Sequence, residues 1–157
     1  MSTARTIRRT LTAAALLASG FALAGGGSIN CPAGTQEIGG PKSERQASTC
    51  QKADGTLHGP YIGYDDEGRV ITRGQVVNGF RDGTFTFYDA DGVKTGETRF
   101  TRGNYDGKRV KYFANGKLRS EEFYVKGNRE GTFRTFNKKG ELVRQATYKA
   151  DRRVASR

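Results

Sequence analysis

The sequence has few of the residues from which catalytic and metal sites are usually built. Its 157 residues include one histidine, two cysteines, one methionine and no tryptophan. One histidine and two cysteines are too few ligands for a zinc site. No serine or cysteine has a second candidate base beyond His58, so a nucleophile–base pair is not indicated. No glycine-rich loop precedes a Lys-Ser or Lys-Thr pair, which argues against a phosphate-binding loop of that kind. We therefore expect no catalytic residue, no metal and no cofactor.

Only one long apolar run is present, and it lies at the start of the chain. Three arginines precede an alanine- and leucine-rich stretch over residues 11–23, and Ala22-Leu23-Ala24 has the A-x-A form of a signal-peptide cleavage site. The stretch is too short and too rich in small residues for a good membrane span. The pattern predicts a helical signal peptide over residues 1–24, cleaved after Ala24, and export to the periplasm or the medium. An uncleaved anchor helix is the alternative.

Both cysteines, Cys31 and Cys50, lie in the part of the chain that would be exported. In an oxidising compartment such a pair predicts one disulfide. Two free thiols or a metal-binding pair is the alternative. The disulfide would lie in the segment 25–54, which we expect to cap the first of the repeats described below.

Positive charge is concentrated in the second half of the chain. The whole sequence has 27 Lys and Arg residues against 16 Asp and Glu residues, a net charge of +11. Residues 25–102 contain 9 basic and 10 acidic residues, whereas residues 103–157 contain 15 basic and 6 acidic residues. This asymmetry favours an anionic partner for the C-terminal region. A solvated cationic surface that maintains solubility is the alternative.

The sequence repeats with a period of 24 residues and no insertions, which is typical of a repeat architecture. The repeats are residues 55–78, 79–102, 103–126 and 127–150, and a basic tail follows at 151–157. Two glycine positions and one aromatic position recur in every repeat: Gly59, Gly83, Gly107 and Gly131; Gly68, Gly92, Gly116 and Gly140; and Tyr64, Tyr88, Tyr112 and Phe136.

Each repeat predicts two strands and two turns. A short first strand, such as 60–64, precedes a four-residue turn that ends in Gly68, where glycine adopts the left-handed conformation without steric cost. A longer second strand, such as 117–125, ends at a second pair of glycines, as in 127–131. Connections this short make neighbouring strands antiparallel. The expected fold is all-β, with a single elongated antiparallel meander sheet of about eight strands.

Alternation along the second strands predicts one drier and one wetter face. The position of Val76 is apolar in all four repeats, whereas the position of Arg73 is charged or polar in all four. The expected turn geometry also predicts three cross-strand pairs: Tyr64 with Val70, Tyr112 with Leu118, and Phe136 with Leu142.

The four repeats resemble MORN-variant repeats, a group that includes the YwqK-type antitoxin components. The resemblance is carried by the segments HGPYIGYDDEGRVITRGQVVNG, DGTFTFYDADGVKTGETRFTRG, DGKRVKYFANGKLRSEEFYVKG and EGTFRTFNKKGELVRQATYKA. It covers residues 55–148 and implies an antiparallel meander with an interaction role. At the position where an aromatic is usual, the repeats have Tyr61, Phe85, Arg109 and Phe133. Arg109 therefore predicts a gap in the aromatic column of the third repeat.

The remaining polar candidates are explained by turns. His58 occupies the position that holds Asp or Glu in the other three repeats, which predicts a turn residue rather than a general base. The acidic runs at 65–67 and 89–91 resemble calcium-loop carboxylates, but the chain re-enters a strand directly after each run and the later ligands of a calcium loop are missing.

Together these features favour a non-enzymatic exported repeat module that mediates protein–protein or envelope-surface interaction. The predicted interaction surface consists of basic residues interleaved with aromatics: Lys108, Arg109, Lys111, Lys117, Arg119, Arg134, Lys138 and Lys139. The partner would be a protein or an anionic envelope component, and nucleic acid is not expected for an exported chain.

The main alternative function is a peripheral binder of anionic membrane lipids or polysaccharide. An antitoxin- or immunity-type partner and a small hydrolase are further alternatives. The near-neutral first half and cationic second half also predict head-to-tail self-association.

Overall fold

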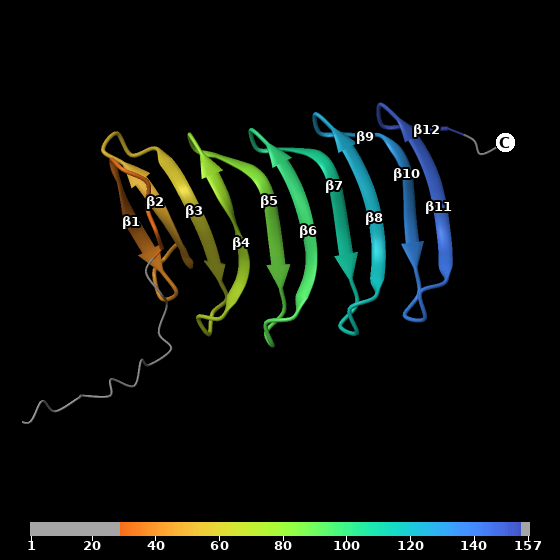
Figure 1. The fold of residues 1–157 in the computed structure, drawn as a ribbon, viewed down its shortest axis with the longest axis horizontal. Helices are drawn as coiled ribbons and strands as arrows, with labels where there is room; N and C mark the ends of the chain where they lie inside the picture. Colours follow the sequence, from red (N-terminus) through yellow and green to blue (C-terminus); the bar gives the residue numbers. More distant parts are fainter. Residues whose placement is uncertain (1–28, 155–157) are drawn as a thin grey trace, which may run out of the picture.

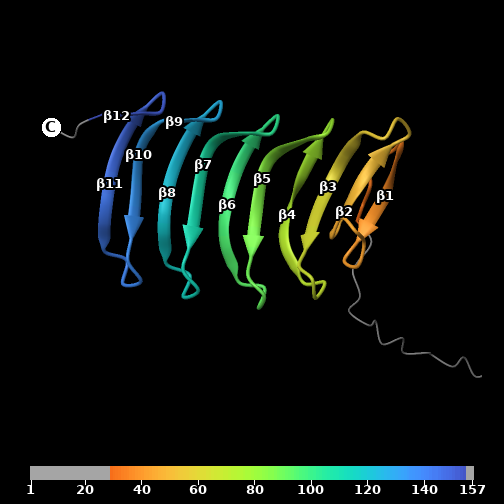
Figure 2. The same ribbon diagram turned by 180° about the vertical axis from the view of Figure 1, so that it is seen from behind.

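The computed structural model describes residues 29–154, which form one open antiparallel sheet (Figures 1 and 2). Consecutive strands lie side by side in chain order, so the sheet is a meander, and the short β9 pairs with β8 next to β10. Within the described range no helix is long and apolar enough to cross a membrane. The strands are β1 (Thr35–Gly40), β2 (Ala47–Lys52), β3 (Leu57–Tyr64), β4 (Val70–Val77), β5 (Phe80–Tyr88), β6 (Lys94–Thr101), β7 (Asn104–Tyr112), β8 (Leu118–Val125), β9 (Asn128–Arg129), β10 (Gly131–Phe136), β11 (Leu142–Lys149) and β12 (Arg152–Val154).

The all-β meander is confirmed, but the described residues form twelve strands rather than about eight. Eight strands come from the repeats as expected. The segment expected only to cap the first repeat forms β1 and β2, and β2 continues the sheet by pairing with β3. The tail adds β12, which pairs with β11 over three residues. In the fourth repeat, Glu130 separates β9 from β10, so that one expected strand becomes two. The predicted signal peptide, residues 1–24, lies outside the described residues.

The first turn of each repeat has the predicted geometry. Gly68, with φ of 82°, follows a bend closed by a hydrogen bond from its own N–H to the carbonyl of Asp65, 2.9 Å long. The register then pairs Tyr64 with Val70, and the other two predicted pairs, at Tyr112 and Phe136, are also present. The Asp65 carboxylate accepts hydrogen bonds from the N–H groups of Glu67 and Arg69, so that it stabilises the turn.

The second turn is tighter than predicted. The expected connection over 127–131 is a two-residue turn at Lys126 and Gly127, whose φ angles are 49° and 88°. Two consecutive left-handed residues are typical of a type I′ turn, whose twist matches that of an antiparallel pair. Lysine, unlike glycine or asparagine, is uncommon in the left-handed region, so Lys126 does not indicate this turn, whereas Asn78 and Gly79 at the same position of the first repeat are a pair that it favours. The following strand therefore begins earlier than expected.

A side-chain acceptor from the previous strand stabilises each of these turns. The carboxylate of Asp106 accepts the N–H of Lys126 at 3.2 Å, and Asp82 and Glu130 make the same contact with Arg102 and Ala150. In the first repeat His58 Nδ1 accepts the N–H of Asn78 at 3.4 Å. His58 thus lies in β3 rather than in a turn. Like the acidic residues at the same position of the other repeats, it accepts a hydrogen bond from a backbone N–H of the adjacent turn.

The core is a row of aromatic rings on one face of the sheet. Neighbouring ring centroids are 4.9–5.9 Å apart along the series Tyr61, Phe85, Phe100, Tyr105, Tyr124, Phe133 and Tyr148. We call this series the aromatic ladder. Phe85 and Phe100 are buried together with Val76, whereas Arg73 on the alternate face is exposed. The predicted drier and wetter faces of β4 are therefore confirmed.

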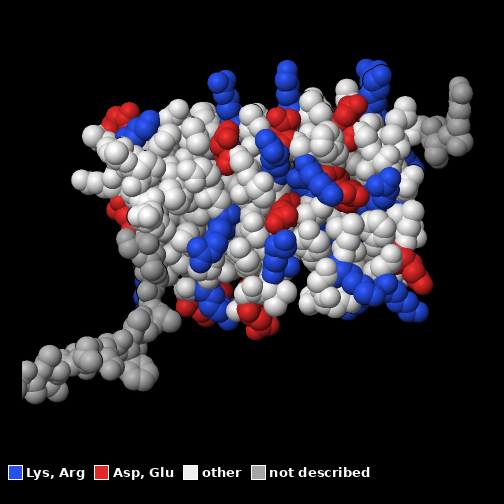
Figure 3. All heavy atoms as spheres, in the orientation of Figure 1, with Lys and Arg blue, Asp and Glu red and all other residues white. Residues whose placement is uncertain are grey.

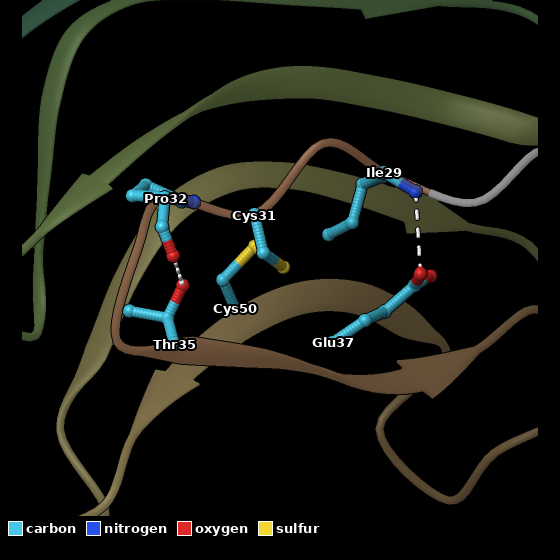
Figure 4. The surroundings of a disulfide bond; sticks show 6 residues. All are labelled: Ile29, Cys31, Pro32, Thr35, Glu37 and Cys50. Atoms are coloured by element: carbon cyan, nitrogen blue, oxygen red, sulfur yellow. Dashed lines mark hydrogen bonds between the residues drawn. A yellow bond between two sulfur atoms is a disulfide. The ribbon is translucent and has the colours of Figure 1, made fainter.

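A second cluster of buried residues joins the N-terminal segment to the sheet. The predicted disulfide between Cys31 and Cys50 is present, and Cys50 is fully buried with Ile29, Ile62 and Tyr64. Figure 4 shows Ile29 and Cys31 directed towards the strands that carry Glu37 and Cys50, and the Ile29 N–H donates to Glu37. The disulfide closes a loop with a sequence separation of 19 residues, a length for which such a bond contributes about 3 kcal/mol.

Substitution of Gly74 by alanine tests the packing of the aromatic ladder. A Cβ at residue 74 would lie 2.6 Å from the ring of Phe85, so the ring must move and the ladder must shift. We expect a loss of about 1–3 kcal/mol in the free energy of unfolding, measured by urea denaturation. The reverse change at the same repeat position, Ala146→Gly, serves as the control and should cost about 1 kcal/mol or less. A Gly74→Ala variant as stable as the wild type would contradict this account of the core.

Substitution of Asp106 tests the acceptor that stabilises the second turn. Asp106→Ala leaves the Lys126 N–H without its carboxylate partner, and we expect it to lower the free energy of unfolding by about 1 kcal/mol. Asp106→Asn keeps an acceptor oxygen and should retain most of the stability. Equal losses in the two variants, measured by thermal unfolding, would show that the hydrogen bond is not the cause.

Candidate anion-binding groove

A groove lies on the sheet around Arg109, where the sequence predicts a gap in the aromatic column. It has a volume of about 470 Å³ and crosses β5, β6, β7 and β8. Four cationic side chains line it: Arg81, Arg109, Lys111 and Arg119. None of the described residues that line it is Asp or Glu. The groove is therefore suited to an anionic ligand.

The groove arises where the third repeat departs from the pattern of the others. In the second repeat, Phe85 covers the flat surface of Gly74 in the preceding strand. In the third repeat the corresponding residues are Arg109 and Thr98, which pair across β6 and β7. The ladder is continued there by Tyr105, whose ring centroid lies 5.2 Å from that of Phe100. An arginine thus stands in place of an aromatic ring while the hydrophobic contacts between repeats continue beside it.

Arg109 is held in position by its neighbours on β8. Its guanidinium donates to Glu122 Oε2 at 3.1 Å, and the hydroxyl of Tyr124 donates to the same oxygen at 3.0 Å. Burial disfavours the charged form of Arg109 and is the largest single influence on it, but the Glu122 carboxylate and the hydroxyl groups of Tyr124 and Tyr105 together raise the arginine pKa above its ordinary value. Burial and the same carboxylate raise the pKa of Tyr124. Arg109 is therefore a fixed cation that is half-buried in the groove.

Three guanidinium groups of the groove lie over aromatic rings. Arg81 is 5.3 Å from the ring centroid of Phe85, Arg109 is 5.3 Å from that of Tyr105, and Arg119 is 5.8 Å from that of Phe113. Cation–π contacts of this kind orient the planar group and leave its N–H donors directed outward along its edge. Arg81, Lys111 and Arg119 form no ion pair within residues 29–154.

The structure divides the predicted basic surface into three parts. Arg109, Lys111 and Arg119 come together in the groove. Lys108 and Arg134 meet away from the groove, where both pair with Glu121, at 2.6 and 3.3 Å. The remaining three, Lys117, Lys138 and Lys139, lie at the turns that follow β7 and β10, where Lys117 Nζ donates to the carbonyl of Lys139.

Sequence reasoning missed Arg81 because it lies in the near-neutral half of the chain. Its position in the repeat is the one that holds Tyr105 in the next repeat, so the 24-residue register places both at the same height on the sheet. The equivalence of Arg81 and Tyr105 in the repeat is the feature of the sequence that could have placed Arg81 beside the predicted basic residues. Figure 3 shows Lys and Arg side chains over the middle and later strands and few over the end formed by β1 to β3.

Residues 105–126 and 129–150 match the family model described as MORN repeat variant. These two segments lie within the third and fourth repeats, the cationic part of the chain. Repeats of this type are in general modules for interaction with proteins or membranes. None of the curated proteins matches the chain.

The Lys108–Glu121 pair makes a prediction about pH. The hydrogen bond from Lys108 is the largest influence that lowers the pKa of the Glu121 carboxyl, and Arg134 adds to it. We expect Lys108→Ala to raise this pKa towards its ordinary value, with a smaller rise for Arg134→Ala, as measured by NMR titration.

The sign of the linked effect follows from the lowered pKa. The stabilisation from Glu121 is present above the pKa of the unfolded chain and is lost as pH falls through the folded-state value. Lys108→Ala should therefore make stability less dependent on pH in the acidic range. Lys138→Ala, at a distant turn, is the control. An unchanged Glu121 pKa in Lys108→Ala would contradict the pairing.

Proposed function

We propose that this chain is a non-enzymatic exported interaction module that binds an anionic component of the cell envelope on one face of its sheet. The observation that carries the proposal is the groove lined by Arg81, Arg109, Lys111 and Arg119 without a lining carboxylate. Exposed cations next to a low-dielectric wall of aromatic rings attract anions more strongly than isolated surface charges do.

The chemistry of the lining residues supports binding rather than catalysis. Arginine remains protonated at neutral pH and is a poor general base. His58 accepts the Asn78 N–H in the first repeat and lies on β3, five strands away from Arg119 on β8. The groove thus offers hydrogen-bond donors and ring surfaces, which are the elements of a recognition site.

Export is supported by the signal-peptide pattern of residues 1–24 and by the Cys31–Cys50 disulfide, because disulfides persist in oxidising compartments. The resemblance of the third and fourth repeats to interaction modules agrees with this proposal. A flat anionic membrane is the second candidate partner, because the same cationic half would be attracted to its surface.

Sedimentation with a native envelope fraction tests the proposed function. The variant Lys111→Glu/Arg119→Glu reverses two cations of the groove, whereas Lys138→Glu/Lys139→Glu makes the same change in net charge at a turn outside it. We expect the groove variant to lose about tenfold in binding, equivalent to about 1.4 kcal/mol. The turn variant should stay within about a factor of two of the wild type, because Lys138 and Lys139 lie outside the groove and do not contact a ligand bound in it. Equal losses in the two variants, or none in either, would refute the groove as the binding site.

A further inference from the structure

The last long strand of the sheet has a neighbour along only part of its outer edge. β12 pairs with β11 at Thr147, Tyr148 and Lys149, and within residues 29–154 no strand pairs with the earlier residues of β11 on this side. Figures 1 and 2 show β12 beside one end of β11 only. Residues 142–146 therefore form an open strand edge, which we call the β11 edge.

In each of the first three repeats the corresponding stretch is paired with the following strand. The residues at the positions of Arg144 and Gln145 are all paired in this way: Thr72 and Arg73 with β5, Gly96 and Glu97 with β7, and Ser120 and Glu121 with β10. On β8 the carbonyl of Phe123 accepts the N–H of Glu130, which follows β9. Gln145 lies two residues before the counterpart of Phe123, so its N–H and C=O point in the same direction, towards the open edge.

The side chains at the β11 edge are apolar and cationic. Val143 is 65% exposed, the highest value among the large hydrophobic residues of the described chain, and Leu142 is 52% exposed. Arg144 is exposed at a position that holds Thr, Gly or Ser in the earlier repeats, and it forms no ion pair within residues 29–154. An unpaired edge with exposed apolar side chains is a template for a further strand.

A second copy of this chain is a poor partner for the β11 edge. β1, at the other end of the sheet, leaves the extended conformation after four residues, because Gly39 and Gly40 have φ angles of 87° and 145°. Like charges on adjacent strands are destabilising. Two β11 edges paired with each other would bring together two sets of cations that have no ion-pair partner within the described chain: Arg144, Lys149, Arg152 and Arg153.

We infer that the β11 edge binds an extended acidic segment of a partner protein, which joins the sheet as its next strand. The backbone of that segment satisfies the N–H and C=O of Gln145. An acidic side chain opposite Arg144 supplies the counter-charge that this residue lacks, and apolar side chains beside it cover Leu142 and Val143. The groove lies on β5 to β8, so the inference concerns a second site and goes beyond the proposed function.

The test is an NMR titration of the full chain with a synthetic ten-residue peptide of alternating valine and glutamate. We expect the Gln145 amide to shift and to exchange with solvent about tenfold more slowly at saturation, because it then donates to the peptide. The same peptide N-methylated at its two central residues is blocked along both of its edges and should bind about tenfold more weakly. A peptide of alternating valine and lysine should lose a similar factor, because it is repelled by Arg144.

Variants of the chain separate backbone pairing from charge. Gln145→Pro removes the N–H that faces the open edge, where proline is tolerated, and should weaken binding of the valine–glutamate peptide about tenfold. Gln145→Ala keeps that N–H and is the matched control, expected within about a factor of two of the wild type. Arg144→Glu should weaken binding about fivefold, whereas Lys138→Glu, at a turn, should stay within about a factor of two. If Gln145→Pro does not fold, Arg144→Glu and the N-methylated peptide decide the question.

Several results would overturn the inference and leave the proposed function standing. They are the absence of a shift at Gln145, equal binding of the valine–glutamate and valine–lysine peptides, and equal loss in Gln145→Pro and Gln145→Ala. Protection of the Gln145 amide in the free chain would also overturn it. Protection that rises with protein concentration would assign the edge to a second copy, and protection lost on removal of residues 155–157 would assign it to the chain's own tail.

The two sites are distinguished by exchanging their variants. Lys111→Glu/Arg119→Glu should bind the valine–glutamate peptide within about a factor of two of the wild type, because both residues lie away from β11. Gln145→Pro should sediment with the envelope fraction as the wild type does. The proposed function fails separately, if the groove variant sediments like the wild type while the peptide still shifts the Gln145 amide.

Discussion

A single-layer sheet has no second layer to cover its hydrophobic face, so its core must be built from side chains that pack along the sheet. In this protein that need is met by the aromatic ladder, in which each ring contacts rings from the adjacent strands. Where a ring lies directly over the neighbouring strand, the residue beneath it must be small. Gly74 under Phe85 is the clearest case, because even a methyl group at residue 74 would meet the ring.

The groove follows from the same constraint. Replacement of an aromatic by Arg109 would leave a hole in the core if nothing else changed. The third repeat compensates with Tyr105, which continues the row of rings, and with Glu122, which partners the guanidinium. The hydrophobic contacts along the sheet are retained, and a cation takes a position that is normally apolar. The candidate site is thus a place where the third repeat has an arginine at an aromatic position, and Tyr105 and Glu122 supply the contacts that this substitution would otherwise remove.

Much of the fold could be predicted because periodic sequence leaves few alternatives. The meander, the pairing of Tyr64 with Val70 and the Cys31–Cys50 disulfide all follow from spacing and turn chemistry. The extra strands could not be predicted so directly. The segment that contains β1 and β2 has no repeat to compare with, and the two-residue turn at Lys126 depends on an acceptor 20 residues earlier in the chain.

The site was predictable only in part. The charge distribution identified Arg109, Lys111 and Arg119, but it could not show that Lys108 lies away from them with Glu121. Charge counts ignore which side of a strand a residue faces, and a bulge near the end of β7 changes that alternation locally. Arg81 was missed because its half of the chain has almost no net charge, although its role depends on one guanidinium and the rings beside it.

The hydrogen bond that supports each second turn reaches back by one strand and no further, and the stacking of rings is equally short-ranged. Contacts of this kind make the array nearly one-dimensional. Unequal recombination within the coding sequence that gains or loses one complete 24-residue period would therefore keep the register of the remaining strands. A gain or loss of one residue within a strand would move rings onto the wrong face. The architecture thus favours changes of length in whole repeats, and a repeat gained or lost before β5 would change the distance between the disulfide-bonded end and the groove by one repeat.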